Sequence, residues 1–186
     1  MLKTSRGPVR EALASLSQEG LIALERHRGA RVAQLTDSDL HEIYSLRSQL
    51  ERLAAEWACR NGTEGDFARM HQVLADFDDM ATPRSPSAVA SLDVAFHDSI
   101  FRAAHHEHLY RAWRGLRSQM FLYLVHKGAL RQDVVRSWKP DHRKLFAAFD
   151  ARDPRAAVAL IGDHIEISFR RAQAASETPN EPASRR

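Results

Sequence analysis

Four side chains in the second half of the sequence, one aspartate and three histidines, have the chemistry of metal ligands. Asp93 and His97 are four residues apart at the edge of an apolar stripe, so a helix would point both side chains the same way. His142 lies one turn before Leu145, and His164 interrupts an apolar stripe near the C-terminus. Taken singly, each is more often a hydrogen-bonded core residue. Because all four occupy positions where core residues are expected, their joint placement suggests one metal site.

Arg47 is a further charged residue on an apolar face, four residues after Ile43 and three before Leu50. A charge that points into a core needs a partner. We therefore expect Arg47 either to pair with an internal carboxylate or to bind an anionic ligand.

The elements that must position these groups are predicted to be helices. Apolar spacing predicts helices over about 36–61, 64–80, 87–105 and 107–127, a short one over 130–136, one that begins at Pro140 and one that begins after Asp153. Thr36 with Asp39 forms a capping signal, and a proline suits the first turn of a helix. Residues 36–172 are thus expected to form a helical domain, followed by a disordered tail over 173–186.

The first 35 residues differ from this domain in pattern and charge. A helix is predicted from about Ser5 to Glu19, followed by two strand-like runs, 21–26 and 30–35, around a turn at Gly29. Residues 1–34 hold six basic and three acidic side chains, which accounts for the whole formal net charge of +3. A helix followed by a basic hairpin is the second half of a winged helix-turn-helix, and localised positive charge is typical of polyanion binding.

The composition excludes several classes of protein. With 44% hydrophobic and 27% charged residues, the 186-residue chain is typical of globular domains. It has no apolar run of the roughly 18 residues that a membrane span needs, and no signal peptide. We expect a soluble, cytoplasmic protein without a membrane partner.

The N-terminal part contains the string Ser5-Arg6-Gly7-Pro8-Val9-Arg10-Glu11-Ala12-Leu13, followed by Glu19-Gly20-Leu21 and Arg28-Gly29-Ala30-Arg31-Val32. These residues resemble the recognition helix and wing of the GntR family of bacterial regulators. The resemblance implies that operator DNA is contacted by Arg6 and Arg10 from the helix and by Arg28, Gly29 and Arg31 from the wing. The alternative is an amphipathic helix with solvated arginines.

The family module begins with two further helices, whereas only four residues precede this helix. We therefore expect Met1 to be an internal methionine of a longer reading frame, with the upstream part needed for DNA binding. The alternative is a naturally shortened chain that binds ligand or dimerises without binding DNA.

A second set of residues lies in the helical part: Asp93-Val94-Ala95-Phe96-His97, His142 before Leu145, His164-Ile165, and Arg47 with Leu50-Glu51. This pattern resembles the FCD effector domain of FadR-like GntR regulators, over about residues 37–170. The resemblance implies an all-helical antiparallel bundle and a homodimer. It also implies a divalent metal, Zn²⁺ or Ni²⁺, held by Asp93, His97, His142 and His164, and a small carboxylate or sugar-acid effector that Arg47 binds.

The function predicted is a DNA-binding transcription regulator, not an enzyme, whose metal-containing helical domain binds an effector that modulates operator binding. A metalloenzyme is a weaker alternative, because no separate general base accompanies the site. Arg102, Arg117 and Tyr123 are further pocket candidates. The run from His105 to His108 is interpreted as a polar helix junction, with a surface metal site as its alternative.

Overall fold

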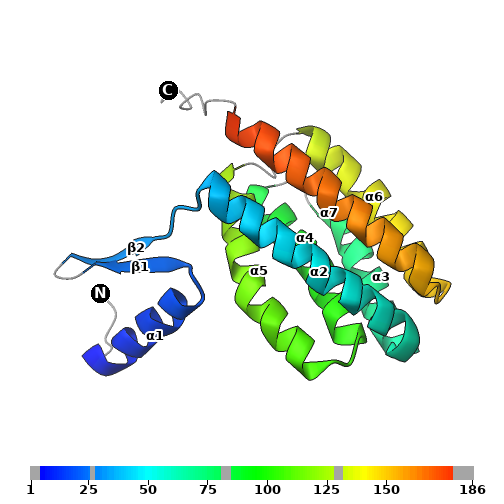
Figure 1. The fold of residues 1–186 in the computed structure, drawn as a ribbon, viewed down its shortest axis with the longest axis horizontal. Coiled ribbons are helices and arrows are strands. Elements are labelled where there is room, and N and C mark those ends of the chain that lie inside the picture. Colours follow the sequence, from blue (N-terminus) through cyan, green and yellow to red (C-terminus); the bar gives the residue numbers. More distant parts are fainter. Residues whose placement is uncertain (1–4, 26–27, 81–84, 128–131, 178–186) are drawn as a thin grey trace.

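The computed structural model describes residues 5–25, 28–80, 85–127 and 132–177 (Figure 1). Its N-terminal part contains α1 (Arg6–Gln18), β1 (Ile22–Glu25) and β2 (Gly29–Val32). The two strands pair antiparallel, with Ile22 opposite Val32 and Glu25 opposite Gly29. Gly20 and Gly29 have φ angles of +71° and +91°, a conformation that favours glycine, at the end of α1 and of the turn. The expected helix and hairpin are confirmed.

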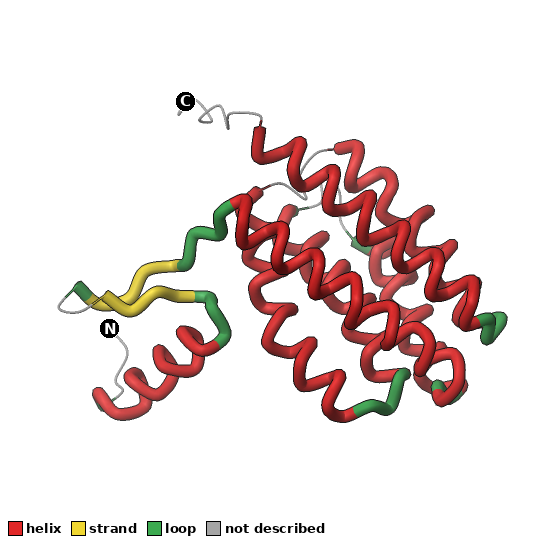
Figure 2. Tube along the Cα trace, in the orientation of Figure 1, coloured by secondary structure: helices red, strands yellow, loops and turns green. Residues whose placement is uncertain are grey.

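The C-terminal part consists of helices joined by short connections (Figure 2). They are α2 (Asp37–Asn61), α3 (Glu64–Asp79), α4 (Pro86–Ala103), α5 (Glu107–Lys127), α6 (Gln132–Asp150) and α7 (Pro154–Glu177). The central helix α2 packs against α7 along its length and also against α4. On its other sides α4 contacts α3 and α5, and α6 packs on α7 and α3. The predicted mostly helical class is confirmed.

Local signals explain where the helices begin. The Thr36 side chain accepts a hydrogen bond from the Asp39 N–H, and Asp39 accepts one from the Thr36 N–H, so α2 starts with a capping box. Thr63 and Asp66 repeat this arrangement at the start of α3. Asp153 accepts hydrogen bonds from two N–H groups in the first turn of α7.

Two expectations about helix boundaries were wrong. Pro140 lies inside α6, which runs without a break from Gln132, so the separate helices expected over 130–136 and from Pro140 are one. A proline inside a helix removes one hydrogen bond; here its ring lies at an exposed position, while Trp138, His142 and Leu145 anchor the buried side of α6. Helix α7 continues to Glu177, although the tail was expected to begin at residue 173.

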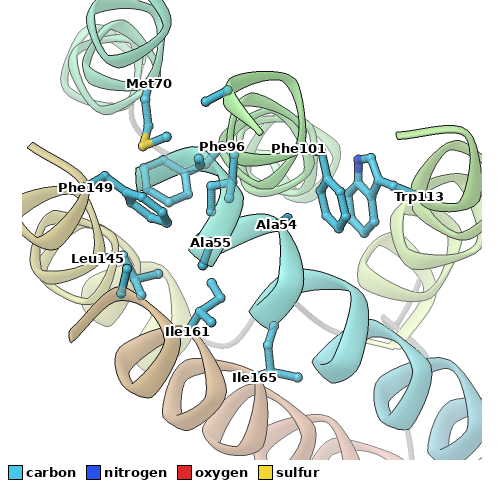
Figure 3. Packing of buried hydrophobic residues seen from close by; sticks show 14 of the residues in the cluster. Ala54, Ala55, Met70, Phe96, Phe101, Trp113, Leu145, Phe149, Ile161 and Ile165 are labelled. Carbon is cyan, nitrogen blue, oxygen red and sulfur yellow. The ribbon is translucent and has the colours of Figure 1, made fainter. Parts of the chain in front are cut away.

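The core lies where the helices meet around α2 and α4 (Figure 3). Ala54 and Ala55 are fully buried on α2, which brings the neighbouring helices close to its backbone. The rings of Phe101 on α4 and Trp113 on α5 stack with their centroids 4.6 Å apart. In the described part of the chain, no helix has the length and apolar character needed to cross a membrane.

The apolar face of α1, in contrast, is left open. Val9 and Leu16 are 43% and 37% exposed.

Candidate metal centre

The predicted metal ligands come together although they belong to three helices. Asp93 and His97 project from α4, His142 from α6 and His164 from α7. One potential ligand atom from each lies within 4.8 Å of those of the other three. His97 and His142 are fully buried, whereas Asp93 and His164 are partly exposed. The cluster therefore sits inside the bundle with one side nearer to solvent.

The arrangement fits a divalent ion. The Nε2 atoms of His97 and His142 are buried and have no hydrogen-bond partner within the described residues, which costs free energy unless a ligand is bound. Three imidazoles and one carboxylate suit borderline metals such as Zn²⁺. One ligand atom from each of the four residues lies within 4.8 Å of the other three, so all four could bind the same ion.

A carboxylate that sequence reasoning gave no role supports His97. Glu51, on α2, is fully buried, and its Oε2 lies 2.6 Å from Nδ1 of the His97 ring. Its other oxygen, Oε1, accepts a hydrogen bond from Nε of Arg47 at 2.5 Å. Arg47 is thus paired with an internal carboxylate, which was one of the two expectations for it. The spacing of Arg47 and Glu51, one turn apart on an apolar face, was the available signal.

Trp138, on α6, contacts two further candidate ligands, Asp93 and His142, and was also missed from the sequence. Its carbonyl oxygen lies 2.6 Å from Nδ1 of His142, and its indole Nε1 donates to Oδ1 of Asp93 at 2.9 Å. Oδ1 of Asp93 in turn lies 3.3 Å from Nε2 of His142. The indole and the imidazole of His142 are stacked. The only signal was that Trp138 lies four residues before a candidate ligand.

The surroundings of His97, His164 and Asp93 shift the pKa values of these three groups toward their metal-binding forms. Burial lowers the pKa of His97. It lowers the pKa of His164 further, with the nearby His142 and His97 adding to the effect. Burial alone would raise the pKa of Asp93, but the contact with His142 and the nearby positive charge hold that pKa well below its usual range. Neutral imidazoles and an ionised carboxylate are the forms that bind metals.

The net charge of the site indicates what else it attracts. With neutral histidines, the formal charges of Arg47, Glu51 and Asp93 leave the site negative by one. A divalent ion would make it positive by one, and an anion would then be attracted to the same place. The burial of Tyr44 beside Arg47 raises the pKa of its hydroxyl to about 12, so this group stays a neutral hydrogen-bonding group.

The remaining pocket candidates are engaged elsewhere. Arg102 and Arg117 both pair with Asp98, at 2.6 and 2.8 Å, on the side of α4 that faces α5. The hydroxyl of Tyr123 donates to the carbonyl of Ala172. His105 contacts Asp66 at 2.8 Å. Within the residues that the structure describes, the cluster around Asp93 is the one group of three or more candidate ligands.

The predicted DNA-contacting residues lie on the separate N-terminal part. Arg10 is exposed on α1, and Arg28 and Gly29 lie at the exposed turn of the hairpin. Arg31 is exposed on β2 and pairs with Glu25 at 3.0 Å. Arg6 begins α1, but its side chain lies outside the described residues.

The N-terminal part touches the bundle at α5. Ser118 Oγ donates to the carboxylate of Glu19 at 3.0 Å, and Gln119 Nε2 lies 3.3 Å from the Glu19 carbonyl oxygen. A small pocket at this junction is lined by Leu21 and Phe121, among others.

Comparison with known proteins identifies the family. Residues 42–167 match the family described as FCD domain. The chain is 34% identical over 172 residues to a probable D-xylose utilization operon transcriptional repressor from Paenarthrobacter nicotinovorans, covering 88% of this chain and 71% of that protein. The chain belongs to the GntR family of transcriptional regulators that carry an FCD domain. The Uxu operon transcriptional regulator of Escherichia coli K12 is 29% identical over 184 residues, covering 89% and 72% of the two chains.

A solved GntR regulator shares the fold. The structure of a putative transcriptional regulator GntR from Rhodococcus sp. RHA1 superposes with a TM-score of 0.79 at 22% identity, over 92% of this chain and 82% of that one. In this FCD regulator, the match over 42–167 includes every residue of the proposed metal centre.

Proposed function

We propose that this FCD regulator is a metal-dependent sensor of small carboxylates that modulates operator binding as a homodimer. The observation that carries the proposal is the convergence of Asp93, His97, His142 and His164, in which the buried Nε2 atoms of His97 and His142 make no hydrogen bond to other described residues. Zn²⁺ is the first candidate ion, with Ni²⁺ the alternative, and Arg47 is the candidate anion-binding residue.

The charge of the site and the names of the relatives favour a sugar acid as the effector. A metal-loaded cluster with an excess positive charge attracts a carboxylate. The buried guanidinium of Arg47, which binds Glu51 through Nε, adds a second positive group beside the cluster. The relatives include gluconate operon repressors of two Bacillus species and a galactonate operon repressor of E. coli. Gluconate and galactonate are sugar acids, and we carry that class of ligand to this chain as a proposal.

The N-terminal part is proposed to contact DNA through Arg6, Arg10, Arg28, Gly29 and Arg31. The domain boundary we propose lies between residues 35 and 36, and the sensor extends to the end of α7 at Glu177. The contact of Glu19 with Ser118 and Gln119 offers a route by which a shift of α5 would reach α1.

Thermal unfolding and gel shifts test the proposal together. We expect Zn²⁺ followed by gluconate or galactonate to raise the melting temperature, as ligands of the native state do. The same acids should change the affinity for DNA from the chain's own upstream region. A melting temperature that rises with neutral sugars but not with the acids would contradict the carboxylate effector. DNA binding that ignores both metal and acid would contradict the coupling.

A further inference from the structure

We infer that Glu51 is a positioning residue of the metal centre, which holds His97 in the tautomer that can bind a metal and joins that ligand to Arg47. The inference rests on the proposed metal centre and adds to it a residue that binds neither metal nor effector. Glu51 is fully buried on α2, and both of its carboxylate oxygens are used, Oε1 by Arg47 and Oε2 by His97.

The contact with His97 determines which ring nitrogen carries the hydrogen. An ionised carboxylate can only accept hydrogen bonds, so Nδ1 of His97 must be the donor, and Nε2 keeps its lone pair. This Nε2 is one of the two buried atoms of the ligand cluster that have no hydrogen-bond partner among the described residues. Pairing a ligating imidazole with a carboxylate also fixes the ring orientation and makes the ligand more basic.

The contact with Arg47 has two consequences. It compensates the negative charge of a carboxylate that is 0% exposed and would otherwise be very costly to bury. It also means that Arg47, the candidate anion-binding residue, and His97, a candidate metal ligand, each bind one of the two carboxylate oxygens of Glu51. An effector anion that draws Arg47 away therefore changes the support of His97, so the two binding events are coupled through Glu51.

An isosteric substitution separates this role from simple packing. Arg47 can only donate hydrogen bonds, so in Glu51→Gln it donates to the amide oxygen of the new glutamine. The amide NH₂ of that side chain then faces Nδ1 of His97. That nitrogen must then accept, so the ring hydrogen moves to Nε2 and blocks the lone pair that the metal needs. Metal affinity is expected to fall although the size of the side chain hardly changes.

A second substitution should reverse the effect. Arg47→Met removes the donor that fixes the amide, so in Glu51→Gln/Arg47→Met the amide can rotate and present its oxygen to His97. The double variant is therefore expected to bind metal more tightly than Glu51→Gln alone. A residue that only fills space gives no such rescue.

The experiment measures Zn²⁺ affinity of the full chain by competition with a chromophoric chelator, and the tautomer of His97 by long-range ¹H–¹⁵N spectra of the zinc-free protein. We expect about 10–100-fold weaker Zn²⁺ binding in Glu51→Gln, with the hydrogen on Nε2, and a return toward wild type in the double variant. Glu56→Gln, on the same helix and partly exposed beside Arg60, is the matched control and should behave as wild type.

The outcomes are distinguishable. Absence of Zn²⁺ binding in the wild type would defeat the proposed metal centre itself. Equal Zn²⁺ affinity and an unchanged tautomer in wild type and Glu51→Gln would overturn the role of Glu51 alone. The wild-type spectrum decides even if Glu51→Gln fails to fold, because a hydrogen on Nε2 of wild-type His97 overturns the inference.

Discussion

Trp138 contacts His142 in two ways: its carbonyl oxygen lies 2.6 Å from Nδ1 of the imidazole, and its indole ring stacks on that imidazole with centroids 4.1 Å apart. The same indole donates to Asp93 from another helix. One residue of α6 is therefore in contact with two candidate ligands, and its ring lies next to the place where an ion would bind.

This contact predicts an optical signal. Adding Zn²⁺ to the metal-free protein should change the tryptophan emission, because the stacked imidazole and the hydrogen-bonded carboxylate both change when they bind an ion. Trp138→Phe should lose most of the change, whereas Trp57→Phe, on the outer side of α2 and 37% exposed, should keep it. A Zn²⁺ response that survives in Trp138→Phe and disappears in Trp57→Phe would place the ion elsewhere.

The buried histidines predict how the stability of the metal-free protein depends on pH. His97 and His164 have folded-state pKa values below the 6.5 of an exposed histidine, because burial disfavours their charged form. Below about pH 6.5 the unfolded chain binds protons that the folded chain does not, so the free energy of unfolding falls as the pH falls. Melting temperatures in chelator should therefore decrease from pH 7.5 to 5.5.

Substitution tests the assignment of that pH dependence. His164→Gln should flatten the decrease, while His108→Gln, at an exposed position of α5, should leave it unchanged. An equal slope in wild type and His164→Gln would show that other groups cause the acid sensitivity.

The core predicts a difference between two phenylalanines on adjacent helices. Phe101 is 1% exposed and stacks on Trp113, so Phe101→Ala should lower the free energy of unfolding by about 3–5 kcal/mol. Phe121 is 37% exposed, and Phe121→Ala should cost less than about 1 kcal/mol. Denaturant titration measures both, and a similar loss in the two variants would contradict the packing of α4 on α5.

Charge at the N-terminal part predicts the effect of Arg10→Ala on DNA binding. Loss of one phosphate or base contact should weaken the affinity for DNA. If the lost contact is to a phosphate, the slope of log affinity against log salt concentration should also become shallower by about 1. Arg111→Ala, an exposed arginine on α5, should leave both unchanged. Binding by Arg10→Ala that equals wild type at every salt concentration would remove α1 from the DNA interface.

Spacing within single helices explains how much of the site was predictable. Asp93 and His97 share a face by their four-residue spacing, and His142 and His164 each stand in an apolar stripe, so each could be expected to point inward. The helices were predictable for the same reason, because apolar periodicity and capping residues act locally.

Contacts between helices explain what was missed. Glu51 meets His97 across the packing of α2 on α4, and Trp138 meets Asp93 across α6 and α4, positions 46 and 45 residues apart in sequence. No local pattern specifies such pairs. Pro140 was misread for a related reason: its local preference is to begin a helix, but the buried residues on either side of it hold α6 continuous.

The metal content of purified variants tests the metal centre most directly. Wild type and His108→Gln, loaded with Zn²⁺ and desalted, should each retain about one ion per chain, as a single four-ligand site requires. His142→Gln removes one buried ligand nitrogen and should retain far less. Equal Zn²⁺ content in wild type and His142→Gln would contradict the four-ligand site and, with it, the proposed sensor.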